Sequence, residues 1–146
     1  MAAPAILTQG TTFTIENSVG TAVAIAGVQS VSGLGSGQAS KIDVTTLLST
    51  AKQYRMGLQD WGDFTMTFLW NPDDAGQAAM RDAKADQSTR EMVVTYDNTD
   101  PTVTLDEETF DVVVLSMSKD ISADGVLQGT ATFGITGDIA LADSTP

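Results

Sequence analysis

The feature that most limits the fold of this sequence is a strict two-residue alternation in the segment DFTMTFLW, residues 63–70. Its large apolar side chains share one parity: Phe64, Met66, Phe68 and Trp70. Successive side chains of a β-strand point to opposite faces of the sheet, so this spacing is typical of a strand with one face in a hydrophobic core. The sequence therefore predicts a core strand over residues 63–70.

Further segments have the β-branched residues and apolar patterning of strands. They are Thr11 to Glu16, Ala22 to Val31, Ser40 to Thr45, Glu91 to Asp97, Thr109 to Ser118 and Val126 to Ile135. The second has apolar side chains on both parities, which predicts a single strand packed on two faces. Turn residues at 17–20, in DNTDP (97–101) and at Asp124-Gly125 predict the connections, and the residues from Asp138 onward predict a short tail.

One helix is expected among these strands. The segment NPDD, residues 71–74, supplies a cap residue, a proline suited to the first helical position and two carboxylates for the first turn. These signals predict a helix over about residues 72–86. Small apolar side chains share one side of it, which predicts close packing on a sheet: Ala75, Ala79, Met80 and Ala83. The expected fold class is mainly β, an antiparallel β-sandwich or partly open barrel with one flanking α-helix, in a single domain over residues 1–146.

Two segments are irregular. Residues 32–40, SGLGSGQAS, are rich in Gly, but their G-x-G-x-G spacing does not match a dinucleotide fingerprint, so we expect a hairpin tip and no nucleotide site. Residues 46–61, the irregular arm, have no clean period. Their apolar groups have no shared face, which suits either a long arm bound to another molecule or a short helix within the domain.

The composition excludes most catalytic chemistry. The chain has no His and no Cys, which removes the usual general base, the usual zinc ligands, the thiolate nucleophile and every disulfide. The remaining carboxylate groups are Asp73 with Asp74, Asp106 to Glu108, and Asp60 with Asp63. Such close neighbours in sequence do not face one another across a pocket as glycoside cleavage requires. We expect no enzyme activity, no cofactor and no dedicated metal site.

The charge also limits the partners. Seven Lys and Arg against 19 Asp and Glu give a formal charge of −12, the wrong sign for tight binding to nucleic acid or to an anionic membrane. No segment approaches the roughly 18 apolar residues of a membrane span, and the N-terminal residues lack the cations of an export signal. We therefore expect neither membrane binding nor export.

In its order of elements, the chain resembles the major tail tube protein of lambda-like long-tailed bacteriophages. The likeness covers roughly residues 10–140. It rests on Lys41 to Thr45, the irregular arm, the strand 63–70 with Asn71-Pro72, the helix, Arg90 to Asn98, Phe110 to Ser118, Lys119 to Gly125 and Phe133 to Ile139. Lambda-like members can carry a further immunoglobulin-like C-terminal domain. The 146 residues do not include one, so no role of that domain is implied.

The resemblance implies a structural subunit that forms homohexameric rings, with the sheet completed between subunits. The rings would stack into a hollow tube through which DNA passes without specific binding. Expected partners are further copies of the chain and the tape-measure, tail-terminator and baseplate or tail-tip proteins, in the virion tail and, during assembly, the host cytoplasm. The tube subunit of a contractile tail or related injection machine is an alternative, and a β-sandwich carbohydrate-binding module is a weaker one.

Two sets of residues are candidates for these roles. The polar parity of the inner strands predicts either a channel wall that does not capture phosphates or a surface that faces bulk solvent on the outside. The lumen-facing candidates are Asp43, Asp63, Thr65, Thr67, Gln128, Thr130 and Thr132. The apolar side chains of the irregular arm predict contact with a neighbouring subunit or ring. The inter-subunit candidates are Leu47, Leu48, Tyr54, Met56 and Trp61.

Overall fold

The computed structural model describes residues 10–96, 105–121, 123 and 125–142 of the chain. The turns predicted at residues 97–101 and at Asp124 therefore lie outside the described residues. The described elements are β1 (Thr12–Glu16), β2 (Ala22–Ala24), β3 (Val28–Ser32), β4 (Lys41–Asp43), β5 (Tyr54–Met56), β6 (Asp63–Leu69), α1 (Ala75–Asp86), β7 (Arg90–Thr95), β8 (Glu107–Asp120) and β9 (Gln128–Ala142).

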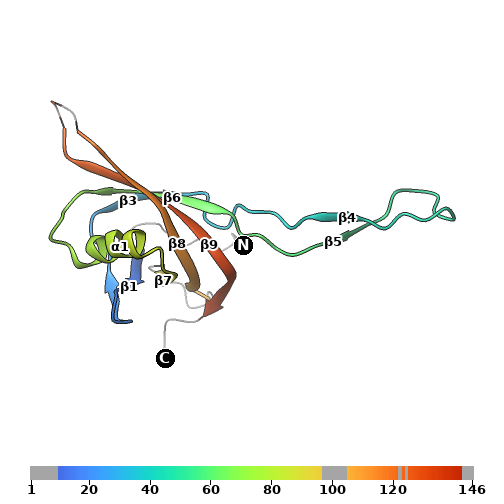
Figure 1. Ribbon diagram of the computed structural model, residues 1–146, viewed down its shortest axis with the longest axis horizontal. Coiled ribbons are helices and arrows are strands. Elements are labelled where there is room, and N and C mark those ends of the chain that lie inside the picture. The colour runs from blue at the N-terminus through green and yellow to red at the C-terminus, as the bar shows by residue number, and fades with distance from the viewer. Residues whose placement is uncertain (1–9, 97–104, 122, 124, 143–146) are drawn as a thin grey trace, which may run out of the picture.

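Seven strands form one antiparallel sheet in the order β2-β1-β7-β8-β9-β6-β3, and β4 and β5 form a separate two-stranded ribbon (Figure 1). The long strands β8 and β9 cross the centre of the sheet and pair with each other over most of their length. The expected mainly β, antiparallel architecture with one helix is confirmed. The sheet stays open and does not close into a barrel.

The two edges of this sheet, β2 and β3, are joined by only three residues, 25–27. The sheet must therefore curl until its edges approach one another. Backbone hydrogen bonds fix this corner: Ile25 N–H donates to Phe13 O at 2.9 Å, and Leu69 N–H donates to Gly27 O at 2.8 Å. The prediction of a single strand from Ala22 to Val31 is wrong, because Gly27 turns the chain at a φ of +78° from one edge to the other.

Helix α1 begins at Ala75, three residues later than predicted, because Asp74 is the N-cap. Its side chain accepts a hydrogen bond from the N–H of Gln77 at 3.0 Å. Pro72 lies in the turn before the helix, and the predicted end at Asp86 is confirmed. The buried residues of α1 are Gly76, Gln77, Ala79, Met80 and Ala83, whereas Ala75 is exposed. A Cβ on Gly76 would overlap the carbonyl oxygen of Ala24, so the helix lies directly against β2.

The core lies inside the curled sheet, with α1 covering it on one side (Figure 1). The predicted core strand is confirmed: Phe64, Met66 and Phe68 of β6 are at most 2% exposed. The ring of Phe64 stacks on Phe133 of β9 at a centroid distance of 5.0 Å and meets Phe110 of β8 edge-on at 5.8 Å. These ring contacts join the central strands of the sheet.

Two predictions about strand ends are wrong. Residues 138–142 continue β9 and do not form a tail, and Glu107 and Glu108 belong to β8 and not to a connection. Register shifts in the β8–β9 pair lie between Thr109 and Asp111 and between Val114 and Ser116. Such β-bulges bend a strand without ending it, so the pairing continues past them.

Residues 33–62 form a long hairpin between β3 and β6 that projects far from the sheet and contains the ribbon β4–β5 (Figure 1). The predicted hairpin tip at 32–40 is wrong, since these residues form one side of the hairpin base. There Gly37 N–H donates to Trp61 O at 3.0 Å. A Cβ on Gly37 would overlap the backbone of residues 60–62, so the crossing of the two chains requires glycine. The irregular arm is the returning half of this hairpin and contains no helix.

Candidate assembly surfaces

Eight hydroxyl side chains form two parallel rows on the outward face of β3, β6, β9 and β8. One row is Ser32, Thr65, Thr132 and Ser116, and the other is Ser30, Thr67, Thr130 and Ser118. Within each row every neighbour is a directly paired residue of the next strand, so the side chains point to the same face. We call this surface the hydroxyl face.

The hydroxyl face contains four of the predicted lumen candidates, Thr65, Thr67, Thr130 and Thr132. Gln128 and Asp63 lie on the same face at its two ends. Gln128 Nε2 donates to Gln29 Oε1 at 2.8 Å, and Asp63 pairs with Gly134. Asp43 lies elsewhere, in β4 of the long hairpin.

Four serines of the hydroxyl face were not among the candidates: Ser30, Ser32, Ser116 and Ser118. Register shifts explain why sequence parity misses them. In β8, Val114 pairs with the buried Phe133, whereas Ser116, of the same parity, pairs with Thr132 on the outward face. A comparable shift separates Val28 from Ser30 in β3. These four serines can be assigned to the hydroxyl face only from the register of the paired strands.

The two rows carry no charge, although the chain has a formal charge of −12. The nearest carboxylates of this face lie beyond the rows, at Asp63 on one end and Asp120 on the other. Lys119 of β8 has its ammonium group over the ring of Trp70 at 4.8 Å, off this face. The hydroxyl face is therefore polar and neutral.

Each side of the hydroxyl face ends in a strand edge with no partner within the described chain. β3 pairs only with β6 and is the last strand of the sheet. β7 pairs with β8 only from Glu107 to Val112, so residues 113–120 of β8 have β9 on one side and no described strand on the other. Unpaired strand edges present N–H and C=O groups that can bind another strand.

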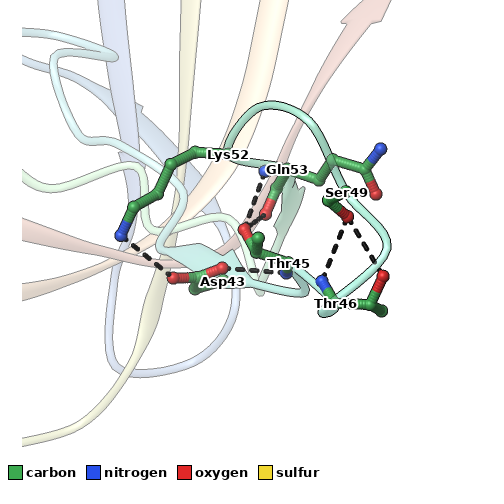
Figure 2. A network of polar contacts seen from close by, with 6 residues as sticks. All are labelled: Asp43, Thr45, Thr46, Ser49, Lys52 and Gln53. Atoms are coloured by element: carbon green, nitrogen blue, oxygen red, sulfur yellow. Dashed lines mark hydrogen bonds and ion pairs between the residues drawn. The ribbon is translucent and has the colours of Figure 1, made fainter.

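Polar contacts hold the end of the long hairpin in a defined shape (Figure 2). Asp43 accepts a hydrogen bond from Thr45 N–H at 2.9 Å and lies 3.8 Å from Lys52 Nζ. Across the hairpin, Gln53 N–H donates to Thr45 Oγ1 at 2.9 Å, and residues 46–49 close the turn. Hydrogen bonds from the Thr45 side chain and backbone lower the pKa of Asp43, and Lys52 lowers it further. The carboxylate therefore stays ionised and holds the turn.

This turn exposes apolar side chains. Leu47 is 104% and Leu48 94% exposed, Met56 is largely exposed, and Tyr54 is partly exposed with Lys41 Nζ 4.2 Å from the centre of its ring. Trp61 differs from the other inter-subunit candidates. It packs against the core at the hairpin base, and its Nε1–H donates to Asp138 Oδ1 at 2.8 Å.

A cavity of about 600 Å³ lies between β1, β7 and β3, with Phe13, Val31 and Val94 among its lining residues. Tyr96 and Glu108 are among its polar lining residues. Burial and the neighbouring Glu108 carboxylate raise the pKa of Tyr96, which keeps the phenol protonated. Tyr96 and Glu108 provide neither an activated nucleophile nor two carboxylates that face one another.

The sequence-predicted carboxylate groups are separated by the fold. Asp74 caps α1, Asp106 is buried before β8, and Asp60 accepts a hydrogen bond from Gly62 N–H at the hairpin base. Within the described residues, no three acidic side chains lie close enough together to hold a metal ion. In the same part of the chain, α1 is neither long nor apolar enough to cross a membrane.

A curled antiparallel sheet with one helix, open strand edges, a neutral face and a projecting hairpin defines a β protein suited to self-association. Residues 4–144 match the family described as phage tail tube, TTP, lambda-like. The chain therefore belongs to the lambda-like phage tail tube family and is a tail tube protein, as the resemblance predicted. No curated protein gives a significant match to it.

Solved structures share this fold. A chain of the SPP1 tail tube is 12% identical, with a TM-score of 0.72, and the match covers 97% of this chain and 81% of that chain. A tail chain of an empty GTA particle is 16% identical, with a TM-score of 0.67 and coverages of 90% and 94%. A chain of the anti-feeding prophage baseplate is 11% identical, with a TM-score of 0.69 and full coverage of both chains.

Proposed function

We propose that this tail tube protein forms homohexameric rings that stack into a hollow conduit for DNA, without enzyme activity. The observation that carries the proposal is the hydroxyl face, a neutral polar surface bounded on both sides by open strand edges. A surface of this kind suits a wall that continues from one subunit to the next.

The two open edges can pair with one another in a ring. The edge of β3 in one subunit would bind residues 113–120 of β8 in the next, which brings Ser30 and Ser32 beside Ser116 and Ser118 of the neighbour. The contact joins two different surfaces, and such heterologous contacts form a closed ring when the rotation closes. Four strands from each of six subunits greatly exceed the roughly eight at which side chains fill a barrel, so a channel would remain.

A neutral wall suits the passage of DNA. Cationic side chains bind phosphates by releasing counterions, and every such contact would be repeated around each ring and along the tube. The hydroxyls of Thr65, Thr67, Thr130 and Thr132 lack that charge. Asp63 and Gln128 would border the same wall. Asp43 belongs to the long hairpin, where it holds the turn, and a lumen role for it has no support in this geometry.

The end of the long hairpin would contact a neighbouring ring. Leu47 and Leu48 expose nearly all of their surface, and burial of a leucine side chain contributes about 1.5–3 kcal/mol. Tyr54 and Met56 lie on the same ribbon and would extend the contact, whereas Trp61 would fix the hairpin base. Because the turn is already hydrogen-bonded, binding would order few additional residues.

The proposed partners follow from the position in a tail. Further copies of the chain form the tube, and tape-measure, tail-terminator and baseplate or tail-tip proteins would contact its inside and ends. The protein would be synthesised in the host cytoplasm and act in the virion tail. The fold is shared with a chain from the sheath-tube complex of an extracellular contractile injection system, so a sheathed tail is equally compatible with it.

Negative-stain microscopy of the purified protein tests the proposal. Hexameric rings or tubes are expected, with no hydrolase activity. Replacing residues 47–56 by a Gly-Ser linker should leave a folded domain that does not polymerise. Only compact monomers of the wild type at high concentration, under all conditions tried, would refute the conduit.

A second experiment tests the wall. Phage that carry Thr65→Lys and Thr130→Lys should assemble tails but eject DNA more slowly, and added salt should relieve the defect because it weakens phosphate binding. Thr89→Lys, on the exposed turn after α1, is the matched control. Ejection by the wall variant at the rate of the control would place the hydroxyl face outside the channel.

A further inference from the structure

The part of the long hairpin beyond its base, residues 41–58, has the opposite charge to the rest of the chain. It contains three cations, Lys41, Lys52 and Arg55, and a single carboxylate, Asp43. This part therefore carries +2 in a chain of formal charge −12, and the remaining residues, Asp60 of the hairpin base included, carry −14. The positive charge of this part of the hairpin is complementary to the negative charge that the rest of another copy carries.

The three cations differ in whether they already contact another side chain of the hairpin. Lys52 lies 3.8 Å from Asp43, and Lys41 lies over the ring of Tyr54. Arg55 is exposed and forms no ion pair within the described part of the chain. It lies opposite Ile42 in the ribbon, so a guanidinium and a half-exposed apolar side chain share one face. Arginine binds carboxylates in a planar, bidentate geometry.

The outward face of β1, β7 and β8 has the matching chemistry. Glu91 lies directly opposite Asp111, and its N–H donates to Glu16 Oε1 at 3.0 Å, so the three carboxylates are neighbours across three strands. Like charges directly opposite one another destabilise a sheet. Arg90, next to Glu91 in β7, is 6% exposed and turned inward, where it donates to Asp86 and Ser88. The described outward residues of these strands include no Lys or Arg.

We infer that the long hairpin of one subunit docks on the outward face of β1, β7 and β8 of a second copy, with Arg55 bound between Glu91 and Asp111. The inference rests on the proposed tube and names the surface that receives the hairpin. Val93 lies in the same face, between the acidic row and Thr95, and offers apolar surface to Ile42. A nucleic acid would satisfy the cations but would leave Leu47 and Leu48 in water, so a protein surface fits the whole hairpin better.

Reciprocal charge substitution tests this docking. Arg55→Glu replaces attraction by repulsion and should raise the protein concentration needed for tube formation about fivefold at low salt. The effect should shrink as the Debye length falls from about 30 Å at 0.01 M to about 8 Å at 0.15 M salt. Glu91→Arg should weaken assembly similarly, and the double variant R55E/E91R should restore it. Lys84→Glu, an exposed cation of α1, is the control with the same change of charge and should assemble like the wild type.

The outcomes separate this inference from the proposed tube. Normal assembly of Arg55→Glu overturns the docking, and so does an impaired R55E/E91R variant. Binding of duplex DNA that Arg55→Glu abolishes and Glu91→Arg leaves unchanged overturns it in favour of nucleic acid. Absence of both rings and tubes in the wild type, under all conditions tried, refutes the conduit instead. In that case sedimentation tests the docking alone. Salt-sensitive association that is lost in R55E and regained in the double variant supports the docking. Any other pattern overturns it.

Discussion

A single buried amide, that of Gln77 in α1, joins the corner where the sheet curls. Its side chain is 1% exposed. Its Nε2 donates to Leu69 O at 2.8 Å and to Ala26 O at 3.2 Å, and its Oε1 accepts from Asn71 N–H at 2.8 Å. These partners belong to the end of β6, the link between β2 and β3, and the turn before α1. We therefore predict that Gln77→Leu destabilises the whole fold, and not α1 alone.

The magnitude follows from the contacts. A net hydrogen bond contributes about 0.5–1.5 kcal/mol, and a buried group left without a partner costs about 1–3 kcal/mol. Ala26 and Asn71 are exposed, so water can replace part of their bonds, whereas Leu69 O faces the buried side chain. The expected loss is about 3 kcal/mol. For a chain of this size that lowers Tm by roughly 6–12 °C.

Urea and thermal unfolding of dilute protein, followed by circular dichroism, measure this loss. Gln77→Glu keeps the acceptor and removes both donated bonds, so it should also destabilise the protein. Gln38→Leu, an exposed glutamine of the long hairpin, is the control and should change stability by less than about 0.5 kcal/mol. A Gln77→Leu variant as stable as this control would refute the argument that the amide holds the corner.

Three further predictions concern single sites. Gly37→Ala should disturb the base of the long hairpin, because its Cβ would overlap Asp60 O, and amide hydrogen exchange should accelerate there while the core stays protected. Asp74→Ala removes the N-cap of α1 and should cost about 1 kcal/mol in urea unfolding. Burial and a nearby carboxylate raise the pKa of Tyr96 in the folded protein above the ordinary value of 10.0. The contribution of Tyr96 to the free energy of unfolding is therefore complete well below pH 10.0 and is lost as the pH rises through the raised pKa. Ultraviolet titration of Tyr54→Phe, which leaves a single tyrosine, should show a raised midpoint; an ordinary midpoint contradicts the burial.

The sequence was most informative where one face of an element is buried. The alternation of β6 and the last turn of α1 were correctly predicted because burial imposes a period that local sequence retains. It was least informative at residues 25–27, because an apolar run shows that a segment is buried but not where it changes strand partner. The start of α1 was also missed, since Asn71, Asp73 and Asp74 are all competent caps. In the structure Asp74 is the one that accepts from Gln77 N–H, and its carboxylate also accepts from Ala26 N–H, a contact that the local sequence does not show.

Residues of the candidate surfaces could be predicted only where a strand keeps its register. Thr65 and Thr67 were found by parity because β6 has no bulge, and their partners in β9 keep the same register. Ser116 has the parity of the buried Val112 and Val114, and the bulge between Val114 and Ser116 turns it outward. A one-residue shift reverses the face of every following side chain, and a single sequence does not encode that shift as a periodic signal.

Repetition of the subunit makes the separation of neutral and charged surfaces necessary in the proposed tube. Any weak attraction between the wall and DNA is multiplied by the number of subunits, as is any weak attraction between the hairpin and a neighbouring body. The first would oppose passage and the second would favour assembly, so the two surfaces need opposite chemistry. The long hairpin leaves the sheet from β3 and β6, the strands that carry half of the hydroxyl face. In the proposed tube these two strands would fix the distance between the neutral wall and the cationic, leucine-bearing contact, and the hydrogen bonds of the hairpin base at Gly37 and Trp61 would preserve that distance in every ring.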